Sequence, residues 1–207
     1  MPTRRKFTKR GIIAVGVVGL SGCLGADGAE EVDAAMELVD ENFEEFEEID
    51  QGDDLPDEAD LDGIERRLDE AESYLDEAAA VADDDEILAA IQLGETFVAF
   101  QRAMVQVVGG FVEIEHAMDS FDAYMEAERF DDAIVEVKRV QTTVNEVDTA
   151  VDDALSAIDD VNEDQLDAED RVSVTLTRSD LERFASEVNA LEEWLLGLTT
   201  LPTDFKR

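Results

Sequence analysis

The chain has 207 residues, of which 55 are acidic, 16 are basic and 44% are hydrophobic, and its formal net charge is −39. A surface with this charge repels nucleic acids and anionic lipid headgroups, which argues against both as partners. The apolar residues recur periodically along most of the chain, which excludes a wholly disordered protein.

Residues 1–22 have the three parts of a signal peptide. Five basic residues and no acid lie in the first ten positions, an apolar run follows at 11–20, and small residues precede Cys23. Ten apolar residues are about half of what a helix needs to cross a bilayer. The segment therefore predicts export rather than a membrane span.

A short motif in the basic region refines this prediction. Within residues 3–9, an arginine pair is followed by an aromatic residue and a lysine at fixed spacing: Arg4, Arg5, Phe7 and Lys9. The segment resembles the twin-arginine export signal, and this resemblance implies export of cargo that is already folded. The alternative is a generic basic region that feeds the general secretion route.

A second motif lies at the end of the signal segment: Leu20, Ser21, Gly22 and Cys23. It resembles the lipobox, which implies cleavage before Cys23 and attachment of a diacyl or dialkyl glycerol to its sulfur. Cys23 is the only cysteine, so no internal disulfide is possible. Two hydrocarbon chains hold a protein stably on a membrane. We therefore expect the protein at the outer face of the cytoplasmic membrane, with the membrane as a partner through Cys23.

The composition of the mature chain points to a source. Removal of residues 1–22 takes away five of the 16 basic residues and no acid, which leaves a net charge of −44 and only two lysines, Lys138 and Lys206. This composition resembles that of proteins from extreme halophiles, and together with the signal it resembles a secreted lipoprotein of a salt-loving archaeon. At molar salt the Debye length is about 3 Å, so self-repulsion is screened.

Residues 23–30 form the lipidated cysteine and a short tether, and two helices are predicted after it. Apolar residues at three- and four-residue spacing predict a helix over about 30–50 and another over about 57–82, separated by the breaker that ends at Pro56. The second helix has the alternating three-four spacing of a coiled-coil seam.

The third predicted helix, about 84–127, is apolar on several faces and is expected at the centre of the assembly. The acidic residues 83–86 supply its N-cap. A membrane span is the alternative because the apolar stretch is long enough. Polar side chains within it argue against a span; they are Gln92, Glu95, Gln101, Arg102 and Gln106.

A fourth helix is predicted over about 130–161, after a turn at 128–132. Residues 124–134 resemble the mid-repeat turn of a tetratricopeptide hairpin over about a third of one repeat, which implies two antiparallel helices. The expected core stripe of this helix consists of Phe130, Ile134, Val137, Val140, Val144, Val147, Val151, Leu155, Ile158 and Val161.

After an acidic segment, residues 171–178 alternate like a strand but have no partner strand in the sequence, so we expect them in a helix. Ser179 and Glu182 form a capping box for a last helix that runs to about 200. The predicted fold is all-α, an antiparallel bundle of four to five long helices that forms one acidic domain over 31–201, with a tail at 202–207.

No catalytic, cofactor-binding or metal-binding motif emerges from the sequence. The one histidine, His116, follows Glu113 at the spacing of di-iron ligands, but a di-iron site needs two such pairs. Residues 160–164 begin like a calcium loop, but the later ligand positions do not fit. We therefore expect no enzyme activity and no cofactor.

Two functional hypotheses remain from the sequence. The first is a surface-anchored helical scaffold or interaction module for another envelope protein, which predicts an exposed apolar patch. The alternative is a solute- or cation-binding lipoprotein, which predicts a polar pocket near Glu95, Gln101, Arg102 and His116. Ordinary helix-face polarity, or an ion pair between Glu95 and Arg102, would also explain these four residues.

Overall fold

The computed structural model describes residues 27–51, 56, 58–161 and, in the last segment, 178, 179, 181, 182, 185, 186 and 188–190. The long elements are four helices: α1 (Ala29–Gln51), α2 (Glu58–Val81), α3 (Asp85–Glu126) and α4 (Phe130–Asp159). Their bounds lie within about two residues of those predicted. The all-α bundle is confirmed, and no strand occurs in the described part of the chain.

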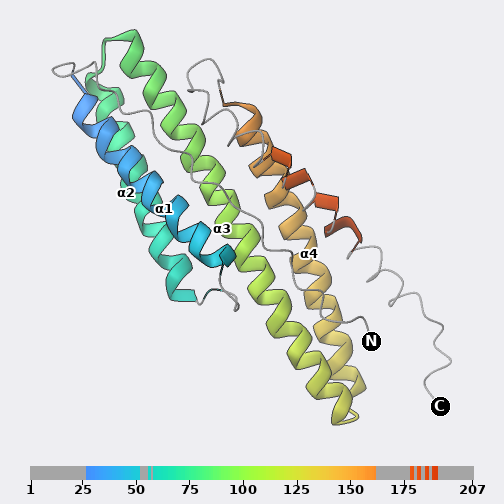
Figure 1. Cartoon of the computed structure of the whole chain (residues 1–207). Coiled ribbons are helices and arrows are strands. Elements are labelled where there is room, and N and C mark those ends of the chain that lie inside the picture. The colour runs from blue at the N-terminus through green and yellow to red at the C-terminus, as the bar shows by residue number, and fades with distance from the viewer. Residues whose placement is uncertain are drawn as a thin grey trace.

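Helix α3 is the axis of the molecule and packs against each of the other three long helices. Figure 1 shows α1 and α2 together along the first part of α3, and α4 along its other side. Helices α2 and α3 are antiparallel, because Gly94 lies against Leu75 while Gly109 lies against Leu61. The last turns of α3 and the first turns of α4 extend beyond α1 and α2 as a two-helix hairpin (Figure 1).

The start of α3 is fixed by its N-cap. The side chain of Asp84 accepts a hydrogen bond from the backbone N–H of Glu86 at 2.8 Å, and Asp85 and Glu86 place negative charge at the positive end of the helix. The predicted cap is therefore confirmed. It turns the chain sharply from α2 into α3.

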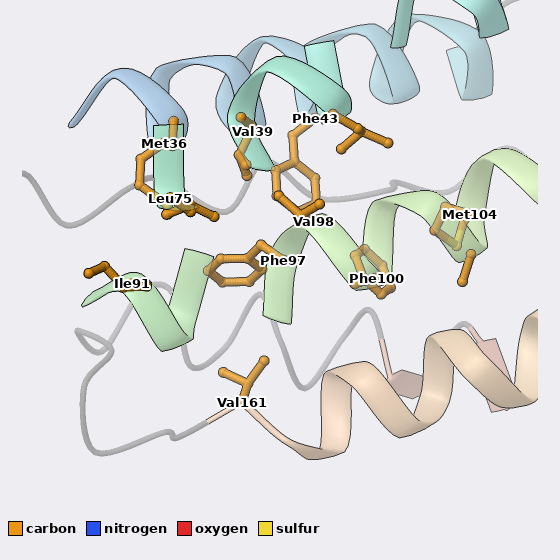
Figure 2. Packing of buried hydrophobic residues seen from close by; sticks show 14 of the residues in the cluster. Met36, Val39, Phe43, Leu75, Ile91, Phe97, Val98, Phe100, Met104 and Val161 are labelled. Atoms are coloured by element: carbon orange, nitrogen blue, oxygen red, sulfur yellow. The ribbon is translucent and has the colours of Figure 1, made fainter. Parts of the chain in front are cut away.

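The larger core lies between α1, α2 and the first half of α3, and its centre is aromatic (Figure 2). The ring of Phe43 meets the ring of Phe97 edge-on at 6.0 Å and stacks near that of Phe100 at 6.2 Å. Ile158, from the end of α4, and Leu181 complete this core from the other side of α3. The apolar stripes predicted for α1 and α2 form this core.

The smaller core lies in the seam between the second half of α3 and α4. Its members are small or β-branched: Val107, Ala117, Val140, Val144, Val147, Ala150, Val151 and Val188. Gly110 allows the close approach, since a Cβ at this position would overlap Cγ2 of Val147. Two helices here share one narrow seam, whereas the rest of α3 is covered on several sides.

Among the described residues, α3 is the one helix that is long and apolar enough to cross a membrane. Of its most apolar 18-residue segment, 44% is buried inside the structure. This helix contacts α1, α2 and α4, as expected of a helix that is apolar on several faces.

Candidate functional site: the tip of the α3–α4 hairpin

The residues predicted for export and lipidation lie outside the described residues. They are Arg4, Arg5, Phe7, Lys9, Leu20, Ser21, Gly22 and Cys23. The first described glycine, Gly28, has a left-handed backbone with φ 92° and lies against Ala78 near the end of α2. The chain therefore enters the bundle at the end where α2 turns into α3.

The four residues of the predicted polar pocket are not brought together. Gln101 is fully buried, its Nε2 donates to the main-chain oxygen of Val39 at 2.8 Å, and its Oε1 accepts from Nδ2 of Asn42 at 3.2 Å. This side chain is used within the core between α1 and α3. Its hydrogen bonds are satisfied by the protein itself, so it has no need of a ligand.

Arg102 lies one position further along α3 and faces α2. Its guanidinium donates to Asp69 at 2.8 Å and to Glu72 at 2.6 Å. The hydrogen bond to Asp69, with a further contribution from Glu72, raises the pKa of Arg102 above its ordinary value. Arg102 thus joins α3 to α2, while Glu95 stays exposed. An ion pair was one of the ordinary explanations for this residue, but its partners are Asp69 and Glu72 instead of Glu95.

His116 is exposed, about 22 Å from Gln101 along the rise of α3. Glu113, its neighbour in the di-iron-like spacing, accepts instead from Nε and the terminal nitrogen of Arg139 on α4, at 3.0 and 2.7 Å. That hydrogen bond raises the pKa of the Arg139 guanidinium. Among the described residues, no group of three or more His, Cys, Asp or Glu side chains could hold a metal ion.

A different feature stands out at the far end of the hairpin, in the turn from α3 to α4. Glu128 has a left-handed backbone with φ 56°, the one non-glycine residue of the described chain with a positive φ. Arg129 makes three contacts in this turn. Its backbone N–H donates a hydrogen bond to the main-chain oxygen of Tyr124 at 2.8 Å, and its guanidinium lies 4.5 Å from the centre of the Tyr124 ring. Its Nε donates to a carboxylate oxygen of Asp132 at 2.8 Å. The turn is well defined by these bonds.

Around this turn, four large apolar side chains are each more than two-fifths exposed: Met125 (43%), Phe130 (57%), Ile134 (47%) and Val135 (61%). The sequence stripe placed Phe130 and Ile134 in the core, and this prediction is wrong. The hairpin extends past α1 and α2, so α3 is the one long helix of the described residues that packs against this part of α4. We call these four residues the apolar tip.

The other exposed large apolar side chains of the described residues, Val81 and Leu88, lie at the opposite end of the molecule. Four acidic residues, 83–86, separate them in sequence, and all four are exposed. This end exposes two large apolar side chains, whereas the tip exposes four.

Comparison with known proteins gives no further constraint: no family model, curated protein or solved structure matches this chain.

Proposed function

We propose that this protein is a lipid-anchored, non-catalytic interaction module that presents the apolar tip to a protein partner at the cell surface. The exposure of Met125, Phe130, Ile134 and Val135 at one end of the molecule carries this proposal. Exposed apolar side chains that cluster on a soluble protein surface mark interaction sites.

The position of the tip relative to the anchor supports this role. Gly28 follows Cys23 by five positions, and an extended chain of five residue steps spans at most about 17 Å. A lipid on Cys23 would therefore hold the end of the bundle where α2 turns into α3. Helix α3 has 42 residues and a length of about 63 Å, so the tip would reach roughly that far from the membrane.

The energetics of the tip also favour a functional role. Ile134 and Val135 are β-branched, and such residues are poorer helix formers than alanine by a few tenths of a kcal/mol each, while 47% and 61% of their surfaces stay exposed. Glu128 occupies a backbone conformation that costs about 1 kcal/mol for a residue other than glycine. Stability alone would select different residues at these positions.

A photo-crosslinking amino acid placed at Val135 tests the proposal in native membranes at molar salt. Ser73 is the matched control, because it is exposed on α2 within the three-helix part of the molecule. We expect a discrete cross-linked protein species from position 135 and none of the same mass from position 73. Equal, diffuse labelling at both positions, or no protein adduct at position 135, would overturn the proposal.

A further inference from the structure

We infer that the partner of the tip is a second copy of this chain, bound through the outer face of the first turns of α4. The inference rests on the proposed function and names its partner. The face consists of Asp131, Ile134, Val135 and Lys138, and all four side chains are exposed. At 100° per residue these positions fall within an arc of about 100° on the helix surface, so they form one surface strip.

Two copies of this strip placed antiparallel match one another in charge and in apolar residues. An acid lies at one end, a cation at the other, and two adjacent apolar residues lie midway between them. A two-fold axis that passes between Ile134 and Val135 and pairs two α4 helices antiparallel brings Asp131 of each copy opposite Lys138 of the other. The same axis places Ile134 opposite Val135 twice. Interfaces between identical copies related by a two-fold axis require this self-complementarity.

The charges needed for the contact are available. The neighbouring cations are engaged within the chain, since Arg129 pairs with Asp132 and Arg139 pairs with Glu113. Neither Asp131 nor Lys138 forms an ion pair with another described residue. Lys138 is one of only two lysines after the signal segment, and it lies one turn from the exposed Ile134.

Two chains that each carry −44 repel one another at low salt. At molar salt the Debye length is about 3 Å, so the long-range repulsion is screened and direct contacts decide the association. The strip is smaller than a standard interface, so a weak complex is expected between free chains. Attachment of many copies to a membrane raises their effective concentration and strengthens the contact.

The antiparallel pairing also sets the geometry of the anchors. Each copy extends about 55 Å from the contact to its tethered end, so the two lipids would lie on the order of 100 Å apart at opposite ends of the pair. This geometry suits a link between two apposed membranes, with one copy contributed by each.

Lipidated protein, reconstituted into phosphatidylcholine vesicles in molar KCl, tests the inference through vesicle clustering measured by light scattering. Sedimentation of the same protein in detergent reports association without a membrane. We expect the wild-type protein to cluster vesicles and to sediment as a monomer–dimer mixture. Lys138→Asp and Asp131→Lys should each weaken association roughly ten-fold, because each converts two attractive contacts into two repulsive ones.

The decisive measurement is the mixture of the two charge variants. Vesicles carrying Lys138→Asp mixed with vesicles carrying Asp131→Lys should cluster again, because every contact between unlike copies is then attractive. The double variant should cluster by itself. Leu88→Glu changes an exposed apolar residue at the tethered end and should leave clustering at the wild-type level.

The inference is overturned if the wild-type protein stays monomeric and fails to cluster vesicles, or if the single variants associate like the wild type. It is also overturned if the mixture fails to recover while circular dichroism shows both variants folded. An adduct from position 135 to a different protein would preserve the proposed function while excluding the second copy.

Discussion

The amide of Asn42 on α1 donates a hydrogen bond to the amide oxygen of Gln101 on α3, with Nδ2 and Oε1 3.2 Å apart and both side chains fully buried. Nε of Arg67 donates to Oδ1 of Asn42 at 2.5 Å, and the same guanidinium pairs with Glu45 nearer the surface. A chain of polar contacts thus runs from solvent into an otherwise apolar core. Because every link joins different helices, the chain fixes the register of α1 against α2 and α3.

Replacement of Gln101 by Leu should lower the free energy of unfolding by about 1–3 kcal/mol, since it leaves Nδ2 of Asn42 buried without an acceptor. The variant Asn42→Leu/Gln101→Leu should lose less than the sum of the two single effects, because either single change already removes the hydrogen bond between the two amides, although Nε of Arg67 then lacks its Asn42 acceptor. Chemical denaturation in molar KCl measures both. If the double variant is destabilised by the sum of the two single effects, the two amides act independently.

The two adjacent glycines of α3 should respond oppositely to alanine. A Cβ at Gly110 would overlap the stiff side chain of Val147, so Gly110→Ala should destabilise the protein by about 1–3 kcal/mol. A Cβ at Gly109 would lie 3.6 Å from Cδ1 of Leu61, an ordinary contact, so Gly109→Ala should stabilise it by about 0.5–1 kcal/mol. Thermal unfolding of the pair provides its own control. Equal effects would mean that α3 and α4 do not meet closely at Gly110.

The stability of the fold should depend strongly on salt. Each pair of like charges on a helix face costs a few tenths of a kcal/mol. Dozens of such pairs in a chain of net charge −44 therefore rival a total stability of roughly 5–15 kcal/mol. We expect the mature chain to be strongly helical by circular dichroism in molar KCl and to lose cooperative unfolding at tens of millimolar. A melting temperature that is indifferent to salt would show that acidic repulsion does not limit this fold.

Loss of the cysteine should release the protein from the membrane. Cys23→Ser removes the one residue that can carry the lipid, so we expect the chain in the medium or as an uncleaved precursor. Membrane fractionation with antibody detection distinguishes these outcomes from the wild type. A Cys23→Ser protein that remains processed and membrane-bound would rule out the lipobox interpretation.

Export itself should require guanidinium groups rather than positive charge alone. Changing Arg4 and Arg5 to Lys keeps the charge but removes the planar donors that a twin-arginine receptor would read. We expect the double variant to accumulate inside the cell. Its normal export would assign the protein to the general secretion route.

The sequence predicted the long helices well because their apolar periodicity is strong and the described chain has few breakers. It also placed α3 at the centre, since a helix that is apolar on several faces needs neighbours on several sides. It failed at Phe130 and Ile134, which continue the stripe of α4 but lie beyond the end of the three-helix part. Periodicity shows which face of a helix is apolar, but not how far its neighbours extend.

The polar residues show the same limit. Gln101 and Arg102 are adjacent in sequence, yet one is buried against α1 and the other bridges to α2. Their partners lie 30 or more positions away on other helices, and only the packing register selects them. The apolar tip could have been found only by comparing the lengths of α2 and α3, whose bounds alone show that α3 is longer by 18 residues.

The continuity of α3 also determines how the molecule would respond to pulling. Force applied between a tethered N-terminus and the tip acts along the helix axes, so it slides α1 past α2 and α3 instead of peeling them apart. Sliding must break all the contacts of α1 with α2 and α3 together, including the hydrogen bond from Asn42 to Gln101. Peeling would break the contacts of one helical turn at a time. Resistance to tension would then be greatest along the long axis, the direction in which a membrane tether and a distant partner pull.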